Sequence, residues 1–255
     1  GGVDAYSKAF VLLQLPHGLL AVSIATTFVP DLARMFHRGD HQQFSQTMSS
    51  GIRLTALLTI PASCGLWVMS KPIIGLLFQH GNFSAAATEN TANALSGLAI
   101  GLAGFSIYLF VLRGFYARND TRTPFFINVG ENAINIVLAI VLVDRHGVFG
   151  LGLSFSIAYL VSALVALLIL ESTEVDIKLS ELAFNIARIA LAAGVMTCVV
   201  WLTIRQVGSD SGVGALSRVV TGTLIGAATY AVALSALGEK TMRDYLSSKI
   251  TKSSR

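Results

Sequence analysis

The chain has 255 residues, of which 53% are hydrophobic and only 13% are charged. Its mean hydropathy is +0.67 and its formal net charge is +4. Soluble domains contain about 25% charged residues, so this chain has too few charges to cover a water-facing surface. The composition therefore predicts an all-α polytopic membrane protein. A nucleic-acid partner is also excluded, because the basic residues lie in short loops between apolar segments, as in membrane proteins.

Seven apolar segments of about 20 residues follow one another, each long enough to cross a hydrocarbon core of roughly 30 Å. They cover residues 5–29, 52–69, 92–112, 125–143, 148–170, 182–204 and 215–237. The shorter apolar run at residues 71–80 is flanked by proline and predicts a helix at the membrane interface. Proline fixes the backbone and lacks an N–H donor. We therefore expect Pro16 to bend the first span and Pro30 to end it.

The distribution of positive charge predicts the orientation, since cytoplasmic loops carry an excess of Lys and Arg. When successive spans alternate in direction, thirteen of the 18 Lys and Arg residues fall on one side. The other five are Lys8, Lys71, Arg145, Arg205 and Arg218. This bias places the N-terminus outside the cytoplasm and the basic tail, residues 238–255, inside it. An odd number of spans and no initiator Met lead us to expect a longer protein whose N-terminal half is missing here.

The sequence contains no recognisable catalytic or metal-binding arrangement. Cys64 and Cys198 stand alone in apolar segments, and the five histidines are scattered over loops and helix ends. We therefore expect no enzyme activity, no organic cofactor and no metal, with Na⁺ or H⁺ as the possible coupling ion discussed below.

Polar groups in the first span form a first candidate site, because polar side chains at membrane depth are costly and mark functional positions. Asp4, Lys8, Gln14 and His17 project from one half of this helix. One interpretation is that Lys8 reaches the membrane interface and pairs with Asp4. The other is that Lys8 faces a water-filled cavity and attracts an anionic headgroup. We predict that Lys8, Gln14 and His17 contact substrate and that Pro16 is a hinge.

The fourth span carries a second polar stripe, in which Asn128, Glu131, Asn132 and Asn135 lie within an arc of about 100°. This stripe is either a seam of interhelical hydrogen bonds with Glu131 protonated or a site for a proton or hard cation, which prefers oxygen ligands. Ser154 lies in the Gly-rich start of the fifth span. It either allows close helix packing or completes an ion site with Glu131, Asn132 and Asn135.

Three stretches together resemble a known family. They are LLQLPHGLLAVSIATTFVPDLAR at residues 12–34, LFQHGNF within residues 76–83, and GFYARNDTRTP at residues 114–124. Their order, spacing and predicted sides are similar to those of the MurJ/MviN lipid II flippase family, within the multidrug/oligosaccharidyl-lipid/polysaccharide exporter superfamily. The resemblance covers essentially the whole chain.

The resemblance implies that these are the last seven of fourteen spans. Residues 1–170 then form five helices of the C-terminal lobe, and residues 171–237 form two additional helices with a groove for a lipid tail. The family is implied to act by alternating access in the bacterial inner membrane. It moves lipid II, a peptidoglycan precursor linked to undecaprenyl pyrophosphate, from the cytoplasmic to the outer leaflet. The implied partners are this lipid, the bilayer and the missing N-terminal half.

Site residues carry over from the family at a few positions. Family members often have an arginine five residues before the Pro-x-Gly of the eighth helix, and Val11 stands there in this chain. We expect Lys8, one turn away, to take that cationic role. Some members bind sodium with an i,i+4 polar pair on the eleventh helix, a spacing that Glu131 and Asn135 share. Two other functions stay open: export of another polyprenyl-linked oligosaccharide or a drug, and a non-transporting scaffold for wall synthesis.

Overall fold

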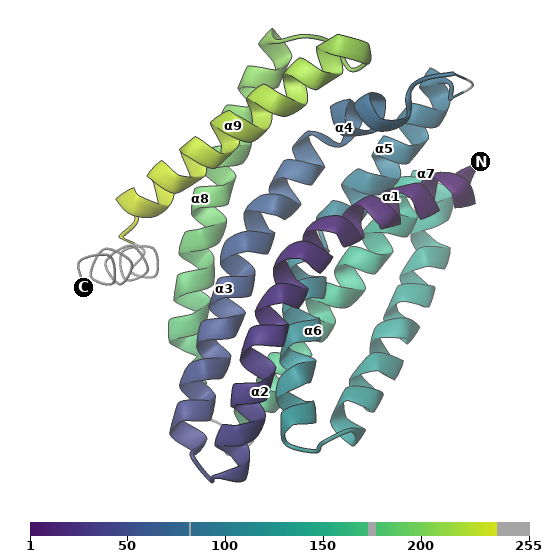
Figure 1. The fold of residues 1–255 in the computed structure, drawn as a ribbon. Coiled ribbons are helices and arrows are strands. Elements are labelled where there is room, and N and C mark those ends of the chain that lie inside the picture. Colours follow the sequence, from purple (N-terminus) through teal and green to yellow (C-terminus); the bar gives the residue numbers. More distant parts are fainter. Residues whose placement is uncertain (82, 173–176, 239–255) are drawn as a thin grey trace.

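The computed structural model describes residues 1–81, 83–172 and 177–238, and all regular secondary structure within them is helical. The elements are α1 (Gly2–Pro16), the π-helical turn η1 (His17–Val22), α2 (Ser23–His37), α3 (His41–Val68), α4 (Ser70–Phe78), α5 (Ala85–Ala99), α6 (Leu102–Ala117), α7 (Arg122–Ser172), α8 (Leu179–Gln206) and α9 (Gly212–Ala236). They form an elongated helix bundle (Figure 1). The predicted basic tail lies outside the described residues, apart from Gly238.

The described helices account for the predicted spans. Five helical segments are long and apolar enough to cross a membrane, and the pair α5 and α6, bent by 46°, passes the same test together. One of the five, α7, has non-helical dihedral angles at Gly147. The Ser154 hydroxyl donates to the side chain of Asn135 at 3.0 Å, although a straight helix would separate these residues by about 28 Å. Therefore α7 folds back at Gly147 into two arms, which correspond to the fourth and fifth predicted spans.

The first span is longer than the sequence predicted. α1, η1 and α2 form one continuous helical segment, and the π turn begins directly after Pro16. The prediction that Pro30 ends the span is wrong, since Pro30 lies inside α2. Beyond it Leu32 is fully buried, and the Phe36 ring packs edge-on against Phe44 of α3. This packing outweighs the single helical hydrogen bond that a proline cannot donate.

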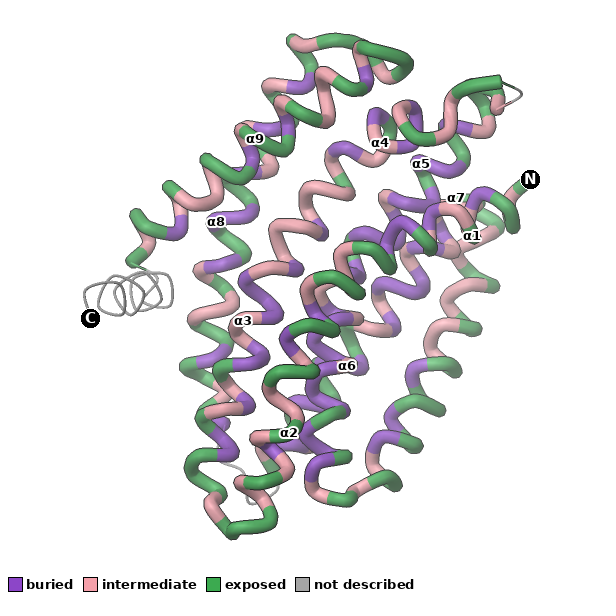
Figure 2. The backbone as a smooth tube through the Cα atoms, in the orientation of Figure 1, coloured by how far each residue is buried: buried purple, intermediate pink, exposed green. Residues whose placement is uncertain are grey.

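Burial is concentrated where the helices face one another (Figure 2). One core cluster joins α2, α3, α6, α7, α8 and α9, and a second joins α1, α4, α5, α6 and α7. Large apolar side chains also remain exposed, among them Phe126, Ile136 and Ile140 on the first arm of α7. A surface of this kind is stable in hydrocarbon, where apolar groups need no cover from water. The bundle is thus built for a membrane.

The second arm of α7 approaches α5 closely through small residues. A Cβ added at Gly152 would lie 2.7 Å from the Leu98 nitrogen and 2.8 Å from the Ala94 oxygen, both of them backbone atoms. The Ser156 hydroxyl donates to the carbonyl of Gly97 at 2.6 Å. The Gly- and Ser-rich start of the fifth span therefore provides close helix packing, which is typical of membrane helix interfaces.

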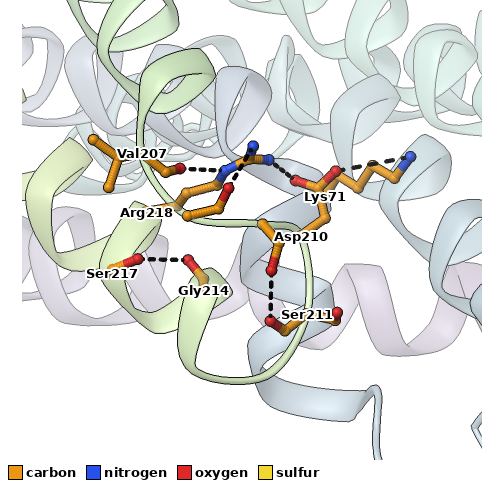
Figure 3. A network of polar contacts seen from close by, with 9 residues as sticks. Lys71, Val207, Asp210, Ser211, Gly214, Ser217 and Arg218 are labelled. Carbon is orange, nitrogen blue, oxygen red and sulfur yellow. Dashed lines mark hydrogen bonds and ion pairs between the residues drawn. The ribbon is translucent and has the colours of Figure 1, made fainter.

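α8 and α9 form a hairpin at one side of the bundle (Figure 1), where α8 contacts α3 and α9 contacts α4. A polar network lies at the end near α4 (Figure 3). Arg218 pairs with Asp210 and donates Nε–H to the carbonyl of Val207 at 2.7 Å, and Lys71 of α4 lies 4.0 Å from Asp210. A Cβ at Gly75 would overlap the Asp210 carbonyl oxygen, so this contact requires glycine. The network joins the hairpin to the remaining helices.

We expect Arg218→Ala to lower the free energy of unfolding by about 1–3 kcal/mol, because it removes the main donor to a half-buried carboxylate and to the loop carbonyls. Lys71→Ala is the matched control: Lys71 is 53% exposed, and an exposed ion pair contributes at most about 1 kcal/mol. Thermal unfolding in detergent, with proteolysis of the α8–α9 loop, measures both effects. Equal and small losses would show that the network does not hold the hairpin.

Candidate functional site

The polar face of α1 begins with Lys8. Its ammonium group pairs with the carboxylate of Asp4 and lies 5.3 Å from the centre of the Phe83 ring. Both contacts hold the charge near the start of the helix, and the pairing with Asp4 is the one that the interface interpretation predicted. The Lys8 side chain is still 31% exposed, and Gln14 is exposed further along the same helix. Both side chains are thus accessible at the surface of the described helix bundle.

His17 faces the inside of the bundle. Its Nδ1 hydrogen-bonds the Ser106 hydroxyl at 2.9 Å, and its ring lies 4.5 Å from that of Phe105 on α6. A pocket of about 280 Å³ opens beside it between η1, α2 and α6, with Thr26 and Arg113 in its lining. The structure therefore does not gather the three predicted substrate residues in one place. Lys8 and Gln14 lie at the surface of the helix bundle, whereas His17 lines an internal pocket next to the π turn.

Glu131 is buried in the first arm of α7, with an exposed fraction of 2%. It interacts electrostatically with three tyrosines, Tyr6 of α1, Tyr108 of α6 and Tyr159 of the second arm of α7. The Tyr108 hydroxyl is buried and has no hydrogen-bond partner among the described residues. The Tyr108 and Tyr159 rings pack against each other with centres 5.6 Å apart, so a buried carboxyl group and phenolic groups of other helical segments lie within electrostatic range of one another. Oxygen groups of this kind can exchange a proton or bind a hard cation.

The remaining residues of the polar stripe divide between two sides of α7. Asn135 accepts the hydrogen bond from Ser154 described above, so these two residues are brought together. Asn132 is exposed, and its amide nitrogen donates to the backbone carbonyl of Asn128 at 2.9 Å. The structure therefore separates Asn132 from the buried Glu131. Sequence reasoning missed the three tyrosines, since no spacing in the sequence relates residues on separate helices.

The motif at residues 114–124 forms the turn into α7. Asn119 has a left-handed backbone (φ 60°), which asparagine tolerates better than most residues. The Asp120 carboxylate accepts hydrogen bonds from the backbone nitrogens of Arg122 (3.0 Å) and Thr123 (3.1 Å), as an N-cap does. Burial alone would raise the pKa of this carboxyl, but those bonds, the Thr123 hydroxyl and the charge of Arg118 hold the pKa below its usual value. The motif therefore fixes a tight, charged turn.

Comparisons with known proteins fit this architecture. The family model described as "Lipid II flippase MurJ" matches residues 1–222. The chain belongs to the MurJ family. This result confirms the resemblance found in the sequence, and the predicted fold class is confirmed with it.

Individual MurJ relatives agree with the family match. A probable lipid II flippase MurJ of Rhizobium meliloti is 30% identical over 80% of this chain and 38% of its own length. The corresponding protein of Vibrio cholerae is 30% identical over 89% of this chain and 44% of its own length. A solved structure, "Lipid II flippase MurJ, inward closed conformation", has a TM-score of 0.79 and 26% identity, and covers 95% of this chain and 48% of that one. The chain thus spans less than half the length of these MurJ proteins.

Proposed function

We propose that the protein is a lipid II flippase of the bacterial cell membrane, to which this chain contributes a set of transport helices. The family match over residues 1–222 carries the proposal. A buried polar cluster around Glu131 supports it, because a passive membrane scaffold has no need of a carboxyl group in its interior. Transport, rather than catalysis, is the activity we propose.

We propose the orientation that the positive charges predict. The turns between α2 and α3 and between α6 and α7 lie at the same end of the bundle (Figure 1). Arg34 and Arg38 lie in the last turn of α2 and directly after it. Arg118 and Arg122 flank the second turn, and Arg113 lies one turn before the end of α6. Cytoplasmic loops are enriched in such residues. This end is then cytoplasmic, and the N-terminus of the chain lies outside.

The proposed mechanism is alternating access, in which substrate and a coupling ion shift the balance between inward-open and outward-open states. A ligand shifts such a balance only by binding the two states with different affinity. Lys8 would attract the pyrophosphate of lipid II as a point charge, and the exposed apolar surface of the α8–α9 hairpin would take its lipid tail. Na⁺ or H⁺ would bind at Glu131, Asn135 and Ser154. Pro16 and the adjoining π turn supply the bend point.

Lys8→Ala is expected to reduce transport about fivefold at limiting substrate, because one basic group near a membrane surface contributes about 1 kcal/mol to binding an anionic lipid. Lys71→Ala is the matched control: Lys71 is an exposed lysine at the same end of the bundle, and we give it no role in substrate binding. Lipid II transport is compared at equal expression in the protein's own host. Full activity of Lys8→Ala would remove Lys8 from the proposed substrate site.

The function itself is tested by placing the gene that encodes this chain under a repressible promoter in its own host. Lipid-linked peptidoglycan precursor is then quantified in each leaflet while the protein is depleted. We expect precursor to accumulate in the cytoplasmic leaflet before growth stops. Normal precursor turnover and wall growth, in a strain without a second flippase, would contradict the proposal and favour a different lipid-linked cargo.

A further inference from the structure

The bend between α5 and α6 interrupts an apolar span. The two helices are inclined by 46° and meet at residues 100 and 101. In a continuous α-helix each N–H donates to the carbonyl four residues back. Here the Gly101 N–H donates to Leu98, three residues back, at 3.0 Å. The break therefore releases carbonyls at the end of α5, and in the interior of a membrane protein these need other donors.

Serine hydroxyl groups from two other helices supply those donors. The Ser156 hydroxyl, on the second arm of α7, lies 2.6 Å from the Gly97 carbonyl oxygen and 3.2 Å from that of Leu98. The Ser63 hydroxyl of α3 donates to the carbonyl of Ala99. Ser156 and Ser63 have exposed fractions of only 0% and 7%. The bend is thus stabilised by buried groups that lie outside the span itself.

The part of α3 that carries Ser63 is itself interrupted. Pro61 lies inside α3 and has no N–H to donate to the carbonyl of Leu57, four residues back. The Tyr230 hydroxyl of α9 donates to that carbonyl at 2.7 Å. A hydroxyl group of a neighbouring helix again replaces a helical bond. Since the backbone ladder of α3 is open beside Ser63, this segment can adjust when Ser63 releases Ala99.

The bent form uses the same acceptors as a straight helix would. If α5 and α6 became continuous, the N–H groups of residues 101–103 would donate to the carbonyls of residues 97–99. Each bond from a serine hydroxyl would then be replaced by a backbone bond. Because acceptors exchange donors rather than lose them, a kink of this kind has two forms of similar free energy, and the inserted hydroxyl groups decide between them.

The bend lies beside the π turn that follows Pro16. α1 and α5 share one core cluster, whereas α2 and most of α6 share the other. The His17 ring of the π turn hydrogen-bonds Ser106 of α6 at 2.9 Å, next to the pocket of about 280 Å³. A change in the angle between α5 and α6 therefore also moves α2 relative to α1, and with it one wall of this pocket.

We propose that the α5–α6 bend is a conformational switch that acts together with the π turn. Bonds from Ser63 and Ser156 hold the bent form, and their release straightens the span and changes the angle at His17. The role of the switch in transport rests on the proposed alternating access. Its two forms are measured without substrate, however, so the switch and lipid II transport can fail separately.

The test measures the bend in the protein reconstituted in vesicles of phosphatidylethanolamine and phosphatidylglycerol. Spin labels are attached at Glu89→Cys on α5 and Tyr116→Cys on α6, since both side chains are exposed. Cys64 and Cys198 are replaced by alanine in every variant. From the rise of a helix, loss of the 46° bend lengthens the separation of the labelled positions by about 3 Å. Double electron–electron resonance gives the populations of the two distances.

Ser63→Ala and Ser156→Ala are each expected to raise the ratio of straight to bent form about tenfold, equivalent to about 1.4 kcal/mol. This is within the cost of leaving a buried carbonyl without a donor. Thr59→Val is the matched control. The Thr59 hydroxyl is also buried in α3, but it donates within that helix, to the carbonyl of Thr55. This variant is expected to leave the distances unchanged.

Unchanged distances in both serine variants would overturn the proposal. An equal shift in Thr59→Val would overturn it as well, because the loss of any buried hydroxyl group would then have the same effect. Ser63 and Ser156 lie on different helices and donate to different carbonyls. Either variant alone therefore decides the test where the other does not fold.

Discussion

Glu131→Gln is expected to weaken the ion dependence of transport. With Na⁺ as the coupling ion, half-maximal activity requires about tenfold more of it, a change equivalent to about 1.4 kcal/mol; with H⁺, the response to pH is lost, because an amide does not take up a proton. The substitution keeps the shape of the side chain but removes the charge that a cation or proton requires. Glu131 is buried, with an exposed fraction of 2%, so solvent does not replace the lost group. Transport of lipid II into proteoliposomes, measured over a range of sodium concentration and pH, gives the shift.

Two further variants show whether this effect belongs to the site. Glu89→Gln removes an exposed carboxylate on α5 and is expected to leave the ion dependence unchanged. Asn132→Ala is expected to have a weaker effect than Glu131→Gln, because the Asn132 amide is bonded to Asn128 on the exposed side of α7. If Glu131→Gln lowers the unfolding temperature but not the ion dependence, the stripe is a structural seam only.

Gly152→Leu is expected to destabilise the bundle by about 3 kcal/mol or more, toward the upper end of the cost of overpacking. The added Cβ alone would lie within 2.8 Å of two backbone atoms of α5, which cannot move aside as a flexible side chain can. The contact between α5 and the second arm of α7 must therefore open. Thermal unfolding in detergent, followed by the loss of helical circular dichroism, measures the change.

Gly194→Ala is the matched control for this effect. Gly194 lies inside α8, where an added Cβ meets no atom within 4 Å. Alanine in a helix interior is favoured over glycine by roughly 0.5–1 kcal/mol, so this variant is expected to be slightly more stable. If both variants lose stability equally, the loss does not come from the approach of α5 to α7.

The sequence was sufficient for the number and order of the spans, because hydropathy over about 20 residues reflects the thickness of the bilayer directly. It also identified the family. Local patterns were less reliable at Pro30, where the tertiary contact between Phe36 and Phe44 outweighs the backbone preference of proline. A rule based on one residue cannot include the packing partner that decides the outcome.

Features that involve several helices could not be predicted. The helical projection placed Asn132 and Glu131 on one stripe, but an arc of about 100° includes both a buried and an exposed side of the helix. The pairing of Lys71 with Asp210 and the hydrogen bond from Tyr230 to Leu57 each join segments that are more than a hundred residues apart. Such contacts depend on how the helices pack, which hydropathy and spacing do not specify.

The fold at Gly147 has a consequence for how the chain enters the bilayer. The first arm of α7 is synthesised before the second, and at that stage the Asn135 amide has no access to its partner Ser154. An unpaired amide in hydrocarbon is costly. We therefore expect the two arms to partition from the translocon into lipid together, as a helical hairpin, with the short polar segment at Asp144 to Gly147 crossing as its tip.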